Sequence, residues 1–160
     1  KATKSPGLLL EVLFIIETSA VQNIYVDRFL PKTPLRIIVD HSGNEVTDKY
    51  PIETFDNKLI TGQIDSLLDN EILVETLLPN MIKTATEIAK KQRIEEIANG
   101  LNRMNMTLNH EIDRLKILQK KNNNIRPEEI QIALKEQAEL TSLIKNAQVR
   151  MDAIQLIRKE

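Results

Sequence analysis

The chain has 160 residues, three phenylalanines, two tyrosines, no tryptophan, no cysteine and a formal net charge of −1. This length suits one compact domain, or a small domain that carries an arm. Without cysteine, disulfides and thiolate metal sites are excluded, and a cytosolic setting is favoured. The longest strongly apolar run, Val12–Ile16, is too short to cross a bilayer. The start at Lys1 suggests a piece of a longer protein.

The charges are distributed unevenly along the chain. Residues 1–82 carry 7 basic and 12 acidic side chains, residues 83–126 carry 10 and 5, and residues 127–160 carry 5 and 6. The middle segment is therefore the basic part of the molecule.

The first third of the chain predicts a small, mainly antiparallel β-sheet. The expected strands cover residues 8–18, 24–28 (a short strand or an extended edge), 35–39 and 45–55, the last as a return strand. Two prolines force an extended path over residues 28–34. Residues 40–44 should form a turn in which Gly43 takes a positive φ.

From residue 57 the spacing of the apolar residues becomes helical. Residues 57–78 predict one or two helices with a break near Gly62, and Pro79 either kinks a helix or opens a long one. Between Pro79 and Lys121 only Gly100 opposes a continuous helix, at a cost of about 1 kcal/mol relative to alanine. Such a helix would be roughly 60 Å long.

The segment 94–160 shows two series of apolar residues with alternating steps of three and four, which is typical of helices that share a narrow seam. An asparagine-rich bend, Lys121–Pro127, separates the two series, and Pro127 suits the first position of a new helix. Folding the series back about this bend places Ile94 opposite Ile154 and Leu118 opposite Ile130. One polar layer remains, Glu111 opposite Gln137, which would fix the register.

These elements predict an α+β fold and a single domain, 1–160. Its expected parts are a β-rich base (1–56), helices that dock on this base (57–93), and a long antiparallel helical hairpin that forms a coiled-coil-like arm (94–160).

Motifs for catalysis and cofactor binding are lacking. The sequence contains no glycine-rich phosphate loop followed by Lys-Ser/Thr, no His-Glu-x-x-His motif and no G-x-S-x-G elbow. His41 and His110 are far apart and show no metal-ligand spacing. We therefore expect no catalytic, cofactor-binding or metal-binding residue in this chain.

The basic segment is the main candidate for an interaction surface. Near the bend it carries Arg114, Lys116, Lys120, Lys121 and Arg126. These side chains either contact phosphates or an acidic protein surface, or simply form a solvated helix face. Ile112 and Leu134 either form an exposed apolar strip that binds a partner or widen the seam of the hairpin.

Several stretches resemble one family. They are Leu10–Glu17 (LEVLFIIE), Arg28–Pro34 (RFLPKTP), Glu53–Phe55, Asn124–Arg126 and Arg150–Ile157 (RMDAIQLI). In this order they resemble the C-terminal domain of the RapA-type RNA polymerase-associated recycling proteins, which are Swi2/Snf2-type ATPases. The Arg-Phe-Leu-Pro-x-Thr-Pro block is the most specific of the matching pieces.

The resemblance implies a bacterial, cytoplasmic protein that binds core RNA polymerase and uses ATP to recycle or remodel stalled polymerase. ATP and magnesium would bind the helicase-like lobes of the parent protein, which would precede this segment, so no catalytic residue is carried over. The expected role is a non-catalytic scaffold that packs on other domains of the same chain. The alternative is a basic helical arm that binds nucleic-acid phosphates without sequence specificity. No membrane partner is expected.

Overall fold

The computed structural model describes residues 7–19, 25–55, 59–62, 69–122 and 126–159. The chain divides into two compact units. Unit 1 contains residues 1–15, 34–91 and 150–160, and unit 2 contains residues 16–33 and 92–149.

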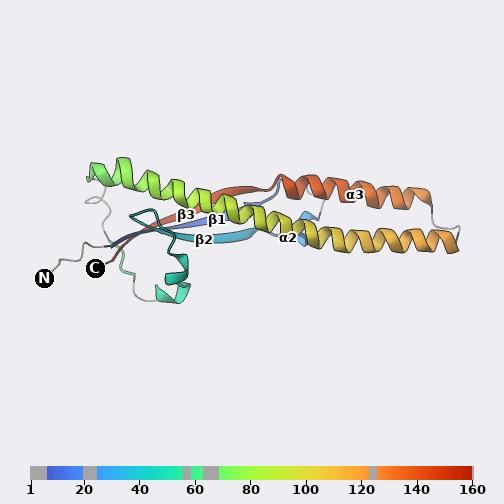
Figure 1. Cartoon of the computed structure of the whole chain (residues 1–160), viewed down its shortest axis with the longest axis horizontal. Coiled ribbons are helices and arrows are strands. Elements are labelled where there is room, and N and C mark those ends of the chain that lie inside the picture. The colour runs from blue at the N-terminus through green and yellow to red at the C-terminus, as the bar shows by residue number, and fades with distance from the viewer. Residues whose placement is uncertain (1–6, 20–24, 56–58, 63–68, 123–125, 160) are drawn as a thin grey trace. The chain divides into compact units, whose positions relative to one another are not determined.

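The sheet has three strands, β1 (Gly7–Glu17), β2 (Thr33–Asp40) and β3 (Gln148–Lys159). Their order is β2-β1-β3, and the sheet is antiparallel (Figure 1). With the helices described below, this confirms the predicted α+β class. The central strand β1 has apolar residues on both faces, which favours a cover on each face, and its backbone pairs with a strand on each side.

Unit 1 has a core on each face of the sheet. One face holds the cluster Leu9, Ile38, Val46 and Ile157, which Tyr50 and Phe55 cover. On the other side of β1, Leu10, Val12 and Phe14 are buried. Helix α2 (Leu78–Lys121) buries Met81, Ala85 and Ala89, spaced four apart, so this stripe faces the interior of the unit.

The expected turn after β2 is confirmed. Gly43 has a φ of 81°, and the Asp40 carboxylate accepts hydrogen bonds from the backbone amides of Ser42 and Asn44, each at 2.9 Å. Burial raises the pKa of Asp40, but the hydrogen bonds from Asn44 and Ser42 outweigh it and hold this pKa below its usual value.

The return strand expected over residues 45–55 is wrong. Glu45 forms only an isolated bridge with Val39, and the chain then makes two short 3₁₀ turns, η2 (Thr47–Lys49) and η3 (Ile52–Thr54). The Thr47 hydroxyl accepts a hydrogen bond of 3.0 Å from the Ile38 amide, so a side chain replaces the backbone carbonyl that a neighbouring strand would supply. Over 24–28, where a short strand or an extended edge was expected, residue 24 lies outside the described residues and the chain forms a 3₁₀ turn, η1 (Val26–Arg28).

Helix begins before Pro79 rather than at it. Residues Glu71 and Ile72 are helical, and η4 (Leu73–Leu77) is a π-helical turn that leads directly into α2. Proline has no amide hydrogen to donate, and its ring crowds the carbonyl of the preceding helical turn. The wider π turn before Pro79 relieves the missing hydrogen bond and the steric clash. Beyond it, the long helix expected up to Lys121 is confirmed. Of the helices expected over 57–78, residues 57, 58 and 63–68 lie outside the described ranges, and residues 59–62 have no regular structure.

In unit 2, the second part of α2 and α3 (Pro127–Lys145) run side by side in opposite directions (Figure 1). As expected, Pro127 opens α3. Arg126 is the N-cap of this helix, and Glu128 and Glu129 lie in its first turn, where negative charge favours the helix dipole.

The helix expected to continue to the end of the chain is wrong, because α3 ends at Lys145 and β3 follows. Ile94 and Ile154, which were expected opposite each other in the seam, are exposed. The apolar spacing of this segment is compatible with either structure, and the open second edge of β1 selects the strand.

Candidate interaction surface on the helical pair

Unit 2 contains a helical pair, which we define as α2 from Gln92 to Lys121 together with α3. The two helices pack against each other along an apolar seam. Met104, Leu140 and Ile144 are almost fully buried, and Ile112 and Ile130 are buried nearer the bend. Leu101, Leu108, Leu115 and Leu118 are half-buried along the same seam. The heptad pattern therefore identified the seam of the pair correctly up to Ile144.

The register of the pair differs from the expected one by about one helical turn. The Gln137 side-chain amide donates to Asn105 Oδ1 at 3.2 Å and to Asn109 Oδ1 at 2.8 Å, so it lies beside these residues and not opposite Glu111. In agreement, a Cβ on Gly100 would lie 3.5 Å from Ile144 Cγ2. Apolar residues spaced three and four apart meet apolar residues again after such a shift, so the pattern alone could not select the register.

The turn η1 packs against the base of the pair. Phe29 and Leu30 are buried there, and Arg103 donates hydrogen bonds from Nε and Nη2 to the Phe29 carbonyl. A Cβ on Gly100 would lie 3.3 Å from this carbonyl oxygen and 3.4 Å from Leu30 Cβ. Gly100 is thus a point of close approach, which the sequence showed only as an unfavourable helical residue.

Ile112 and Leu134, for which an exposed strip and a wider seam were the two alternatives, differ in exposure. Ile112 is only 3% exposed and belongs to the seam, whereas Leu134 is 40% exposed. The explanation that Ile112 widens the seam is therefore the one that its burial supports.

Of the five basic candidates near the bend, Arg114 is engaged within the helix. Its guanidinium forms hydrogen bonds of 2.9 and 2.6 Å with the two carboxylate oxygens of Glu111. This side-chain hydrogen bond lowers the pKa of Glu111 and raises that of Arg114. Both side chains are about half exposed, so the pair contributes little to stability.

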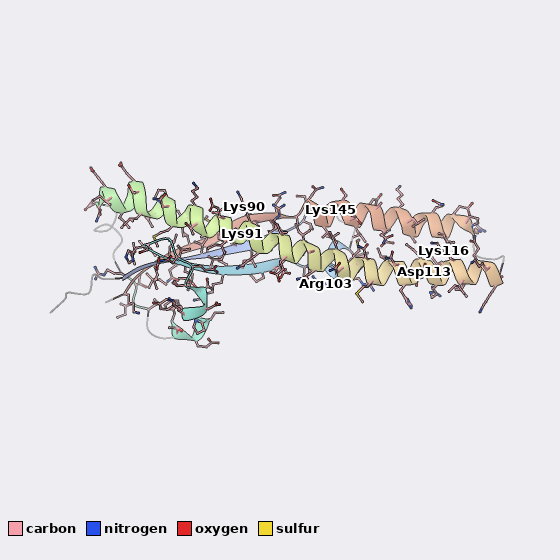
Figure 2. All side chains as sticks on the ribbon, viewed as in Figure 1. Lys90, Lys91, Arg103, Asp113, Lys116 and Lys145 are labelled. Carbon is pink, nitrogen blue, oxygen red and sulfur yellow. The ribbon has the colours of Figure 1, made fainter. Side chains whose placement is uncertain are left out.

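The other four basic candidates, Lys116, Lys120, Lys121 and Arg126, are exposed. Within the described part of the chain, none of them forms an ion pair with a carboxylate. Lys120 and Lys121 occupy the last turn of α2, where positive charge favours the helix dipole. Figure 2 shows Lys116 and Asp113 toward the end of α2 that precedes the bend, and Lys145 at the end of α3.

Both flanks of the pair carry side chains of both charges. One flank combines a stripe of α2 with a stripe of α3, and the Gln137 hydrogen bonds join the two stripes. Its residues are Asn102, Asn105, Asn109, Asp113, Lys116 and Lys120 on α2, and Leu134, Gln137, Ala138, Thr141 and Lys145 on α3. The opposite flank carries Glu111, Arg114 and Lys121 on α2, and Glu129 and Glu136 on α3.

The described residues contain no group of three or more His, Cys, Asp or Glu side chains that could hold a metal ion, and none of their helices is long and apolar enough to span a membrane. An open hollow of about 420 Å³ lies in unit 1 between the turn at His41–Gly43 and the start of α2. Its lining includes Lys83, Thr84 and Glu87, and the Thr84 hydroxyl donates a hydrogen bond of 3.0 Å to the Asn80 carbonyl.

Comparison with known proteins identifies relatives. A family model described as "RNA polymerase recycling family C-terminal" matches residues 1–158. The RNA polymerase-associated protein RapA of Vibrio cholerae is 32% identical over 160 residues, which cover 98% of this chain and 16% of the relative. Proteins of the same name from Photobacterium profundum and Vibrio campbellii are each 31% identical with the same coverage. The chain thus spans only 16% of the length of these relatives.

Proposed function

Because this chain belongs to the RNA polymerase recycling family, as the C-terminal domain that the family model describes, we propose that it is a non-catalytic interaction domain. The whole protein would be an ATP-dependent transcription factor that recycles or remodels stalled RNA polymerase in the bacterial cytoplasm. ATP and magnesium would bind elsewhere in that protein. The match over residues 1–158 carries this proposal.

The form of unit 2 supports a role in binding. A pair of helices with a buried seam holds its outer side chains in a fixed arrangement, which suits contact with a partner. The partner proposed is core RNA polymerase, reached together with the other domains of the parent protein.

The test is capture of purified bacterial core RNA polymerase by the immobilised chain. We expect retention above that of an unrelated helical protein of similar charge. The variant Met104→Asp, which places a carboxylate in the seam, should reduce retention because it separates the helices. Equal retention by the unrelated protein would contradict the proposal. In a separate assay, ATP turnover by the chain should not exceed background.

A second candidate function is binding of nucleic-acid phosphates by the exposed cations near the bend. Lys116, Lys120, Lys121 and Arg126 favour it because carboxylates of the described residues do not neutralise them. If they bind phosphates, affinity for duplex DNA should fall steeply with salt, and the triple variant Lys116→Ala, Lys120→Ala, Lys121→Ala should flatten that dependence. Salt-independent or undetectable binding would exclude this candidate.

A further inference from the structure

We propose that the outer edge of β3 pairs with the same edge of a second copy of this chain, so that two sheets join across a two-fold axis. We define this edge as residues 150–159, which all belong to unit 1. The inference goes beyond the proposed function, because it concerns association of the chain with itself and does not depend on binding to polymerase.

The two edges of the sheet differ in how their backbone groups are bonded. At the edge of β2, the Val46 amide donates to the Ile38 carbonyl at 2.8 Å, and the Asp40 amide donates to the Asn44 carbonyl at 2.9 Å. At the other edge, β1 is the neighbour of β3 in the sheet (Figure 1), and no described residue outside the sheet bonds to the backbone of residues 151–157. An edge strand directs every second pair of N–H and C=O groups outward, so β3 offers these groups to another strand.

Strand β3 lacks the features that usually protect an edge. It is 12 residues long, about twice the usual length of a strand, and contains neither proline nor glycine. Residues 150–155 are exposed, and among them Met151 and Ile154 are 40% and 49% exposed. The segment 153–157 (AIQLI) carries no charge. A long, exposed and largely apolar edge of this kind favours pairing with a further strand.

The sequence of β3 is complementary to itself in one antiparallel arrangement. When the pair is centred on Gln155, Asp152 lies opposite Arg158 of the second copy, and Ile154 lies opposite Leu156 of the second copy. Two-fold symmetry makes each of these pairs occur twice. Opposite charges and apolar side chains that face each other directly across antiparallel strands stabilise the pairing.

The charges disfavour the neighbouring registers. A pair centred one residue before Gln155 sets Arg150 against Arg158, and one centred one residue after it sets Ile154 against Arg158. Like charges directly opposite each other destabilise a strand pair, and so does an apolar side chain opposite a charge. Asp152 already accepts a hydrogen bond of 2.9 Å from Arg150, and a carboxylate has room for a second guanidinium.

The apolar layer on one face of the sheet ends at β3. A Cβ on Gly7 would lie 3.7 Å from Lys159 Cβ, and counting along the antiparallel strands from this contact places Ile154 beside Val12. Val12 is fully buried, whereas Ile154 is half exposed. Leu156 of a second copy would extend this layer and remove Ile154 from water, which favours association.

The first test exchanges the facing charges and follows the association of the chain by sedimentation equilibrium. The parent chain should form dimers as its concentration rises. Asp152→Arg and Arg158→Asp should each weaken association at least ten-fold, because each sets like charges opposite each other. An equimolar mixture of the two variants should associate again, because each arginine of one chain then faces an aspartate of the other. The matched control is Lys135→Glu, an exposed charge reversal on α3. Circular dichroism confirms that each variant is folded.

The second test uses the absence of cysteine from the chain. In Gln155→Cys the two introduced thiols face each other across the axis, with about 4.5 to 5.5 Å between their Cα atoms, a distance that suits a disulfide. Mild oxidation should therefore link two chains. The control Ala153→Cys is also exposed and lies on the same face of β3, but its two copies would be roughly 14 Å apart along the strands and should not be linked.

A parent chain that stays monomeric at every concentration would overturn the inference and leave the edge of β3 to a strand of another protein. Dimers that neither charge variant weakens would place the contact on another surface. A mixture of the two charge variants that associates no better than either variant alone, or equal linkage of the two cysteine variants, would contradict the pairing centred on Gln155.

Discussion

The guanidinium of Arg103 donates two hydrogen bonds, of 3.2 and 2.9 Å, to the backbone carbonyl of Phe29. These residues lie far apart in the sequence, and the contact ties the turn η1 to the base of the helical pair. The carbonyl belongs to the Arg28–Pro34 block, whose two prolines and 3₁₀ turn leave few regular backbone partners. A side chain on α2 therefore supplies the donors.

Removing the guanidinium should destabilise unit 2. In Arg103→Ala the Phe29 carbonyl loses both donors, and we expect a loss of about 1 kcal/mol, because Arg103 is itself exposed and water replaces part of the contact. Arg103→Lys should lose about half as much. Chemical denaturation followed by circular dichroism measures both losses. An alanine variant as stable as the parent would show that this contact contributes nothing.

Gly100→Ala should not bring the usual benefit of alanine in a helix. At an open helical position the exchange stabilises by about 1 kcal/mol. Here the new Cβ would lie 3.3 Å from the Phe29 carbonyl oxygen, a backbone atom that cannot easily move away. We therefore expect a net change in the free energy of unfolding near zero. Gly100→Leu should destabilise clearly. The matched control is Ala98→Gly at an exposed position of the same helix, with an expected loss of about 1 kcal/mol. A full gain in Gly100→Ala would contradict the close approach.

The register of the helical pair can be measured by double-mutant cycles. Alanine substitutions at Gln137 and Asn109 should be coupled by about 0.5 kcal/mol, because each removes the same hydrogen bond. The cycle that joins Gln137 with Glu111 should give a coupling energy near zero, since Glu111 is bonded to Arg114. A larger coupling energy for Gln137 with Glu111 than for Gln137 with Asn109 would instead support the register that the sequence pattern suggested.

The pair of Glu111 and Arg114 gives a dependence on pH with a definite sign. The folded-state pKa of Glu111 lies below its usual value, so its contribution to stability is present above the unfolded-state pKa and disappears as the pH falls through the folded-state pKa. In Arg114→Ala the pKa of Glu111, measured by NMR titration, should rise toward its usual value. The stability difference between parent and variant should vanish in acid. A variant with an unchanged Glu111 pKa would show that Arg114 is not its cause.

Features that depend on local chemistry could be predicted from the sequence. Pro127 with the acidic residues after it fixed the start of α3, and Asp40 with Gly43 fixed the turn after β2. The long helix also followed from its own spacing. Each of these depends on residues only a few positions apart, whose preferences act in the same direction.

Features that depend on distant partners could not be predicted. Residues 148–159 become a strand because β1 has a second edge to fill, and nothing in their own spacing reveals that edge. Likewise the role of Gly100 depends on Phe29 and Leu30, which reach it only in the folded chain. In the candidate surface, the basic residues were identified, but the side chains of α3 that lie beside them became visible only with the correct register.

The neighbouring positions of β1 and β3 have a practical consequence for engineering. A Cβ on Gly7 would lie 3.7 Å from Lys159 Cβ, so the first and last residues of the sheet are adjacent. A short linker from Lys159 back to Gly7 would therefore close the chain into a ring without stretching it. New ends could then be opened at the bend between Lys121 and Pro127, yielding a circular permutant whose two helices can carry a fluorophore each at their tips.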